Sequence, residues 1–298
     1  MNKFRKIILL LIVIALIAGI VLISVNFVLS KADVKKNPIV TMAIEGYGTI
    51  KIELYPDKAP NTVKNFVRLT QRGYYDGKTI TDVEEKLIRG GLTEETDENG
   101  NTTITGPKIS NLRDLAENET DKAYNIKGEF IENGYNDNTL SHQRGVISMY
   151  RHTEANYKNE LDMVRLMGDE YSAYADTLVE DMQDSQNGGF FILTEDAPEF
   201  DGQFTAFGRV IEGMDVLDSI SKIELKKPDA ESTDENTEKT EQEISTKPVV
   251  APIITKVTVE TSGVDYGIPE TENYFEFDDI FNMFMQSYMQ SGSTVTAE

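Results

Sequence analysis

The sequence predicts a mainly β protein: a closed barrel with two short helices, a helical insertion and an N-terminal transmembrane helix. Three observations lead to this fold class. Short apolar segments alternate with Gly-containing turns along most of the chain, two brief stretches show helical spacing, and a long N-terminal run lacks charged residues. Short, numerous strands with few helices between them favour a barrel over alternating βαβ units.

The N-terminal segment predicts a membrane anchor. Residues 7–29 contain no charged side chain and are long enough to cross the hydrocarbon core as a helix. Lys3, Arg5 and Lys6 precede this run, and basic residues there favour a cytoplasmic N-terminus. A cleaved signal peptide is the alternative, although its apolar core is usually shorter. Both interpretations place residues 37–298 outside the cytoplasm.

The pattern after residue 37 predicts the barrel elements in order. Residues 40–44 and 50–54 alternate apolar and polar side chains around a Gly-Tyr-Gly turn, which indicates a β-hairpin. Pro60 begins a helical stretch that Gly73 ends. Further strands are expected within residues 145–149, 188–194, 204–211 and 249–261, with a short helix after residue 213.

Three segments read as additions to the barrel. Residues 154–184 carry apolar side chains at spacings of three or four, which predicts helices broken near Gly168. Residues 226–247 are acidic and almost without apolar side chains, which predicts a disordered loop. The tail, residues 262–298, mixes acidic and aromatic residues and is interpreted either as docked on its own domain or a partner, or as disordered.

Composition excludes several classes of function. The chain has 298 residues, 29 basic and 51 acidic, for a net charge of −22. This acidity argues against nucleic acid as a partner, because phosphate binding depends on Lys and Arg. The absence of Cys excludes disulfides and thiolate metal sites. With only two His residues as well, we expect neither a metal nor a cofactor.

The predicted segments resemble, in order and spacing, the cyclophilin family of peptidyl-prolyl cis/trans isomerases. The resemblance covers residues 38–261, interrupted by the insertions, and implies an eight-stranded barrel. It divides the chain into a stub (1–6), the anchor (7–29), a linker (30–37), the barrel domain (38–261) and the tail (262–298). The matching motifs are residues 60–66, 73–77, 145–149, 190–194 and 207–214.

The resemblance also implies the chemistry. Rotation about an Xaa–Pro amide has a barrier near 20 kcal/mol and takes tens of seconds or longer unaided. A catalyst must bind the twisted amide better than either planar form. The family does this with an apolar pocket for the proline ring and an Arg guanidinium that donates toward the amide.

The polar part of that site differs in this sequence. Asp82 falls at the position of the catalytic Arg, and Arg89 falls at a Gln, in a segment one residue shorter than the family pattern. Arg89 or Arg151 could supply the guanidinium from a neighbouring strand, and Arg89 is the candidate catalytic residue. The alternative is that Arg89 only pairs with a nearby acid on the surface.

The apolar part of the site is largely retained. Leu87, Phe191 and Phe200 match apolar positions of the family pocket, while Gly189 replaces a Gln and Phe204 replaces a His. Tyr150 and Arg151 replace small and Asn residues beside the peptide groove. The candidate substrate-binding residues are therefore Ile80, Asp82, Leu87, Tyr150, Arg151, Gly189, Phe191, Phe200 and Phe204.

The resemblance implies a peptidyl-prolyl isomerase that assists the folding of exported proteins, with a degraded catalytic motif. The alternative is a non-catalytic binder or chaperone of proline-containing or extended segments. The expected partners are unfolded or proline-containing exported polypeptides and the membrane. In the family fold, the insertion 154–184 would border the peptide groove as a lid or form a surface for self-association.

Overall fold

The computed structural model describes residues 37–96, 102–227, 245–274 and 277–293. The chain divides into two compact units, residues 1–36 and 37–298, and only the second is described. The predicted anchor at residues 7–29 and most of the predicted acidic loop lie outside the described residues. Within the described ranges, no helix combines the length and apolar character needed to span a bilayer.

The predicted β-hairpin is present as β1 (Ile39–Ile44) and β2 (Gly48–Leu54). Val40 and Met42 of β1 are fully buried, and so are Ile50 and Ile52 of β2. They pair directly, Val40 with Ile52 and Met42 with Ile50. The alternation seen in the sequence thus puts one face of the hairpin into the core.

The hairpin belongs to an antiparallel sheet of eight strands in the order β11-β1-β2-β10-β8-β9-β4-β3. The short central strands are buried along their whole length. The remaining strands are β3 (Ile80–Val83), β4 (Leu87–Gly90), β8 (Val146–Met149), β9 (Phe190–Leu193), β10 (Ala206–Glu212) and β11 (Ile254–Glu260).

The sheet is curled, and its two ends meet only over a short stretch. Strands β3 and β11 are at opposite ends of the strand order and share no ladder. A single antiparallel bridge joins Thr79 to Ile253, and the Ile80 N–H donates to the Pro252 carbonyl at 2.9 Å. The expected closed barrel is therefore corrected to a curled eight-stranded sheet.

The main core is packed between this sheet and helix α2 (Pro60–Gln71). Phe66 stacks on Tyr75 with 4.7 Å between ring centroids and approaches Phe207 at 5.2 Å. The first turn of α2 lacks a side-chain cap of its own. Glu129 supplies it, because its carboxylate accepts the N–H groups of Asn61 and Thr62 at 2.9 and 2.8 Å. The second short helix is α5 (Met214–Ile220).

Smaller elements complete the sheet-bearing part. Two two-stranded sheets pair β5 with β6 and β7 with β12. Their bounds are β5 (Thr93–Thr96), β6 (Thr102–Thr105), β7 (Tyr124–Asn125) and β12 (Glu272–Asn273), and the short 3-10 helices here are η1 (Ile109–Asn111), η2 (Ile131–Asn133) and η5 (Pro198–Phe200).

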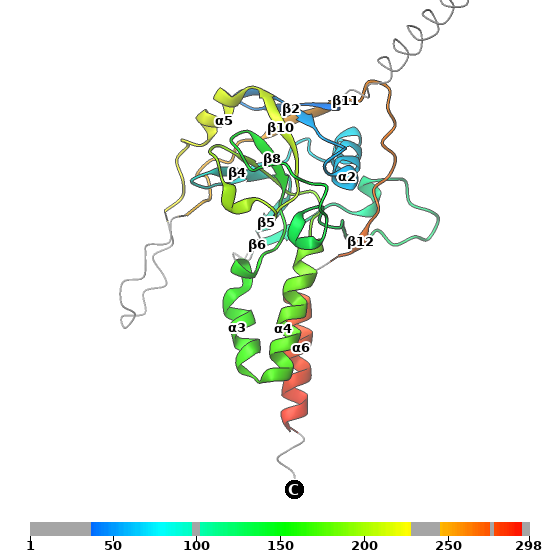
Figure 1. The fold of residues 1–298 in the computed structure, drawn as a ribbon, viewed down its shortest axis with the longest axis vertical. Coiled ribbons are helices and arrows are strands. Elements are labelled where there is room, and N and C mark those ends of the chain that lie inside the picture. Colours follow the sequence, from blue (N-terminus) through cyan, green and yellow to red (C-terminus); the bar gives the residue numbers. More distant parts are fainter. Residues whose placement is uncertain (1–36, 97–101, 228–244, 275–276, 294–298) are drawn as a thin grey trace, which may run out of the picture. The chain divides into compact units, whose positions relative to one another are not determined.

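The insertion and the tail form a helical bundle with its own core. The insertion comprises η3 (Glu154–Tyr157), α3 (Lys158–Leu166), α4 (Asp169–Asp181) and η4 (Met182–Asp184). It turns between α3 and α4 at Gly168, whose φ of 134° is open to glycine but not to most residues. The tail helix α6 (Phe277–Ser293) lies beside this hairpin (Figure 1) and buries Phe277 against it. The tail is therefore docked on its own chain.

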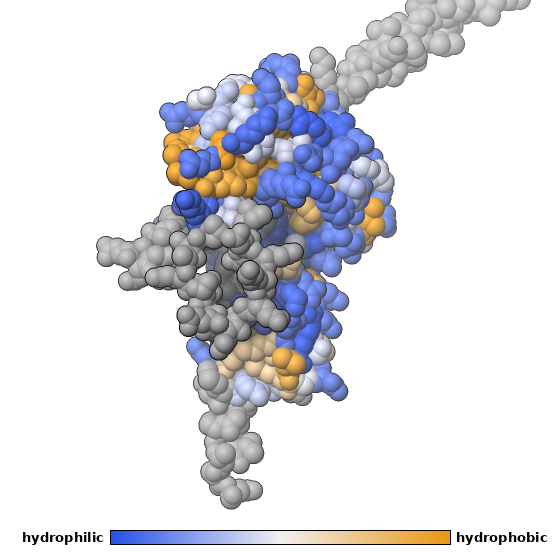
Figure 2. Space-filling view, turned by 90° about the vertical axis from the view of Figure 1, so that its left-hand side faces the viewer, coloured by the Kyte–Doolittle hydropathy of each residue, from blue (hydrophilic) through white to orange (hydrophobic). Residues whose placement is uncertain are grey.

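Some apolar side chains are exposed on the sheet-bearing part and on the helical bundle. Leu166, the last residue of α3, is 88% exposed, and Val250 before β11 is 77% exposed. Figure 2 shows one face on which hydrophobic residues gather over the sheet-bearing part, bordered by hydrophilic ones. Exposed apolar areas of this kind often mark contact surfaces. Neither Leu166 nor Val250 lines the pocket described below.

Candidate functional site

A pocket of about 140 Å³ lies where strand β4 meets β9. This volume suits one side chain or ring and is smaller than the usual pocket for a drug-sized ligand. Its walls come from β4, β9, η5, the segment after β8, and the start of the insertion. The lining residues are Glu84, Leu87, Arg89, Tyr150, Arg151, Thr153, Asn156, Phe191, Phe200 and Phe204.

The floor of the pocket is aromatic. Phe191 is 2% exposed and meets Phe200 and Phe204 edge-on, with centroids 5.8 and 5.3 Å apart. These rings and Leu87 belong to an apolar cluster separate from the main core. Edge-to-face contacts of this kind hold rings in fixed orientations. The pocket therefore offers a preformed apolar surface to a ring.

Arg89 brings a positive charge to the edge of this floor. It pairs with Phe191 in the β4–β9 ladder, so the two residues are direct neighbours across the strands. The guanidinium lies 4.6 Å from the centroid of the Tyr150 ring, within the range of a cation–π contact. Arg89 thus lies at the pocket, as one interpretation of the sequence expected, and it also pairs with an acid, Asp82, as the alternative expected.

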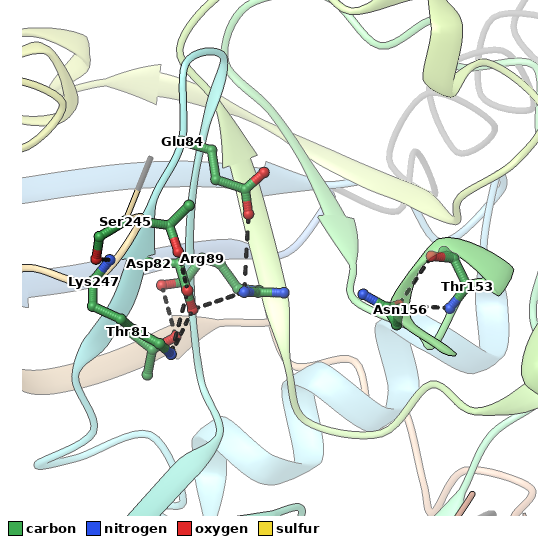
Figure 3. A network of polar contacts seen from close by, with 9 residues as sticks. Thr81, Asp82, Glu84, Arg89, Thr153, Asn156, Ser245 and Lys247 are labelled. Atoms are coloured by element: carbon green, nitrogen blue, oxygen red, sulfur yellow. Dashed lines mark hydrogen bonds and ion pairs between the residues drawn. The ribbon is translucent and has the colours of Figure 1, made fainter. Parts of the chain in front are cut away.

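Asp82 on β3 holds the Arg89 side chain in place (Figure 3). The Arg89 Nε donates to Asp82 Oδ2 at 3.0 Å, and Arg89 Nη2 forms an ion pair with the same oxygen at 2.9 Å. The other carboxylate oxygen of Asp82 accepts from Thr246 Oγ1 at 2.8 Å, and Lys247 Nζ lies 3.3 Å away. The 2% exposed carboxylate of Asp82 is therefore balanced by two cations and a hydroxyl.

These contacts set the charge states around the pocket. Burial would raise the pKa of Asp82, but the hydrogen bond and charge of Arg89 outweigh it and lower that pKa below its ordinary value. Burial likewise works against ionised Arg89, yet its pKa is raised because of Asp82. Burial raises the pKa of the pocket residue Glu84, although Arg89 opposes the shift. Asp82 and Arg89 are both charged at neutral pH.

Arg151 is fixed in a different way. Its guanidinium lies 5.0 Å from the ring centroids of both Phe130 and Phe204. Its Nε donates to the Gln203 carbonyl at 2.9 Å, and its Nη1 donates to the His152 carbonyl at 2.8 Å. Through these contacts the Arg151 guanidinium supports the pocket wall. Arg89 is therefore better placed than Arg151 to donate to a bound peptide.

His142 supports the floor from behind. The His142 ring stacks on Phe191 with centroids 6.4 Å apart. Its Nδ1 lies 3.0 Å from Asp201 Oδ1, and its Nε2 lies 3.0 Å from Ser148 Oγ. Burial lowers the pKa of His142, although Asp201 opposes this. We assign His142 a positioning role, because it is 2% exposed and is not among the lining residues.

The structure brings together seven of the ten residues predicted for the site. They line one pocket: Leu87, Arg89, Tyr150, Arg151, Phe191, Phe200 and Phe204. Asp82 contacts the pocket only through Arg89. Ile80 packs in the main core instead, and the space beside Gly189 is filled by Leu92, 3.0 Å from where a Cβ would lie. Whether the seven bind a peptide stays a prediction.

Sequence reasoning missed three lining residues: Glu84, Thr153 and Asn156. Glu84 lies between β3 and β4, where the segment is shorter than the family pattern. Thr153 caps the first turn of the insertion and Asn156 lies in that turn, and their Thr-x-x-Asn spacing is typical of the start of a helix. Within the described ranges, no group of three or more Asp, Glu or His side chains is placed to hold a metal ion.

Comparisons with known proteins show to which family this chain is similar. The sequence model of the family described as "Cyclophilin type peptidyl-prolyl cis-trans isomerase/CLD" matches residues 39–162 and 173–248. A "Putative peptidyl-prolyl cis-trans isomerase" of Staphylococcus epidermidis is 26% identical over 67% of this chain and 89% of its own length.

Another relative and one solved structure are similar to this chain over comparable lengths. "Peptidyl-prolyl cis-trans isomerase-like 2" of Rhizopus delemar is 25% identical over 62% of this chain, but the matched part is only 25% of that protein. A crystal structure of a Cryptosporidium parvum cyclophilin type isomerase, determined in the presence of the dipeptide Ala-Pro, is 20% identical. It covers 74% of this chain and 98% of its own, with a TM-score of 0.46.

Proposed function

This chain belongs to the cyclophilin-type peptidyl-prolyl cis-trans isomerase family, and we propose that its pocket catalyses rotation about Xaa–Pro bonds with Arg89 as the catalytic residue. The proline ring would rest on Phe191, Phe200 and Phe204. The observation that carries the proposal is the position of Arg89, which lines the pocket and pairs directly with Phe191.

The chemistry needs only positioning and one donor. As the amide twists, its resonance is lost and a lone pair develops on the proline nitrogen. A guanidinium N–H can donate to that lone pair, and this contact exists only in the twisted form. Arg89 uses Nε and Nη2 to bind Asp82, while its Nη1 makes no hydrogen bond within the described residues. That group is the donor we assign to the reaction.

The test compares Arg89→Ala and Arg89→Lys with wild type in an isomerisation assay on a proline-containing tetrapeptide. We expect Arg89→Ala to lose most of the acceleration, and Arg89→Lys to recover little of it because Lys lacks the planar fork. Arg72→Ala is the control, since Arg72 pairs with the exposed Asp114 away from the pocket. Equal rates for wild type and Arg89→Ala would remove Arg89 from the mechanism.

A non-catalytic binder of proline-containing segments is the second candidate. Asp82 favours it, because the residue at the family's catalytic position is an acid whose charge partly neutralises the Arg89 guanidinium. This candidate predicts that wild type binds the tetrapeptide without accelerating its isomerisation. The same assay, combined with a binding titration, separates the two functions.

We further propose that the domain works outside the membrane, tethered by residues 7–29, and that its clients are exported polypeptides. The uncharged run and the basic residues before it support this placement. Treating intact cells with an external protease tests it, because an exposed domain would be digested and a cytoplasmic one protected. Sedimentation analysis of residues 37–298 would show whether the helical bundle also mediates self-association.

A further inference from the structure

One wall of the pocket comes from the insertion and not from the curled sheet. Thr153 and Asn156 both line the pocket, and both belong to the turn that begins the insertion. We propose that Asn156 is a substrate-binding residue whose side-chain amide donates a hydrogen bond to a backbone carbonyl of the bound peptide. This inference rests on the proposed function, because it concerns the same peptide site.

The contacts of Asn156 fix which end of its amide faces the pocket. Its Oδ1 accepts from the Thr153 N–H at 2.8 Å and from Thr153 Oγ1 at 2.9 Å. A backbone N–H can only donate, so the atom facing Thr153 must be the oxygen. The Nδ2 group therefore points away from Thr153, and it makes no hydrogen bond within the described residues.

The position of this donor suits an extended peptide. Figure 3 shows Asn156 across from Arg89, with the nitrogen end of its amide on the side that faces Arg89. A peptide whose proline ring rests on Phe191 would pass between the two. Its carbonyl groups, which need donors once they leave water, would meet Arg89 on one side and Asn156 on the other.

The turn that carries Asn156 is anchored by the next residue. The Tyr157 ring stacks on Phe277 of α6 with centroids 4.0 Å apart. The Tyr157 hydroxyl lies 3.1 Å from His152 Nδ1, in the segment that joins the pocket to the insertion. Asn156 is thus held by contacts on the sheet side and on the bundle side, and preorganisation of this kind reduces the entropic cost of binding.

The test is Asn156→Asp in the full chain. Aspartate keeps the oxygen that caps Thr153 but replaces the N–H donor with an acceptor, so the turn should persist while peptide binding weakens. We expect the Kd of a neutral proline-containing tetrapeptide to rise about five- to tenfold, with KM rising similarly and kcat little changed. Asn159→Asp is the matched control, because it adds the same charge three residues later, at an exposed site outside the pocket lining.

A peptide series identifies the acceptor. Tetrapeptides in which one carbonyl oxygen at a time is replaced by sulfur, a weaker acceptor, should bind wild type less well at one position. For Asn156→Asp, the peptide with sulfur at that position should bind no more weakly than the corresponding peptide with oxygen. If Asn156→Asp binds every peptide as wild type does, the inference is wrong while the proposed function stands. If wild type binds no proline peptide, both are overturned.

Discussion

Arg89 and Asp82 face each other across the antiparallel pair of β4 and β3, and Arg89 Nη2 lies 2.9 Å from Asp82 Oδ2. The acid occupies the position at which the family resemblance places its catalytic Arg, and the guanidinium comes from the neighbouring strand. Although Asp82 replaces the Arg, the Arg89 guanidinium keeps a positive charge at the edge of the pocket. That cation depends on a buried carboxylate.

Asp82→Asn should destabilise the protein. The amide keeps the volume of the carboxyl group but leaves Arg89 and Lys247 without their shared anion. We expect the free energy of unfolding to fall by about 2 kcal/mol at pH 7. Urea denaturation measures it. Asp114→Asn is the control, because this acid is 93% exposed in its pair with Arg72 and such pairs contribute little.

The pH dependence of that difference checks its cause. Because the pKa of Asp82 is lowered in the folded state from an ordinary value of 3.8, its stabilising charge is fully present above that value. The contribution is lost as the pH falls through 3.8 toward the folded pKa. The stability difference between wild type and Asp82→Asn should therefore shrink at pH 3. A constant difference would mean that packing, and not charge, is responsible.

Tyr150 should matter through its ring. The Arg89 guanidinium lies 4.6 Å from that ring, so Tyr150→Phe keeps the contact and Tyr150→Leu removes it. We expect Tyr150→Phe to isomerise the tetrapeptide at close to the wild-type rate, and Tyr150→Leu to lose about tenfold because Arg89 is less well held. Equal losses in both variants would instead point to the hydroxyl group.

Much of the fold could be predicted because its signals are local. The alternation in residues 40–44 and 50–54 gave the hairpin, and Pro60 marked the first residue of α2. The aromatic floor could be predicted as well, since Phe191 lies in a motif that resembles the family and Phe200 matches an apolar position of the family pocket. In these segments neighbouring residues in the sequence decide the structure.

The different surroundings of Ile80 and Asp82 could not be predicted, because they depend on the register of β3 against β4. Ile80 and Asp82 are two residues apart, a spacing that normally puts side chains on one face of a strand. A register irregularity lies between them, so Ile80 enters the main core while Asp82 meets Arg89. Asp82 and Lys247, which are in contact, are separated by 165 residues in the sequence. Nothing in the local sequence marks either feature.

His152 should make stability depend on pH. Burial, together with the charge of Arg89, lowers the pKa of His152 to about 4 from 6.5, so the folded protein keeps the ring neutral. The unfolded chain takes up the proton first as the pH falls below 6.5, and stability is lost from there toward pH 4. Relative to His152→Gln, wild type should lose about 1.5 kcal/mol between pH 6.5 and 5.

Urea denaturation at both pH values measures this difference. Comparing the two proteins at each pH cancels the titration of the carboxylates that they share. A difference that does not change between pH 6.5 and 5 would show that His152 titrates normally in the folded protein.

Phe277 should hold the tail helix on the insertion. Its side chain is fully buried and stacks on Tyr157 of η3. Phe277→Ala should remove about 3 kcal/mol from the bundle. Because the bundle core is separate from the core of the sheet, the loss should appear as faster amide hydrogen exchange in α3, α4 and α6, with strand protection unchanged. Met283→Ala on the same helix is the control, since Met283 is 64% exposed.

The same variant shows whether the bundle supports the pocket. Tyr157 follows Asn156 directly, so loosening its stack should let the pocket wall move and weaken tetrapeptide binding in Phe277→Ala but not in Met283→Ala. Binding that stays at the wild-type level, while exchange in the bundle accelerates, would mean that Thr153 and Asn156 keep their places without α6. The contact between His152 and Tyr157 would then be enough to hold the turn.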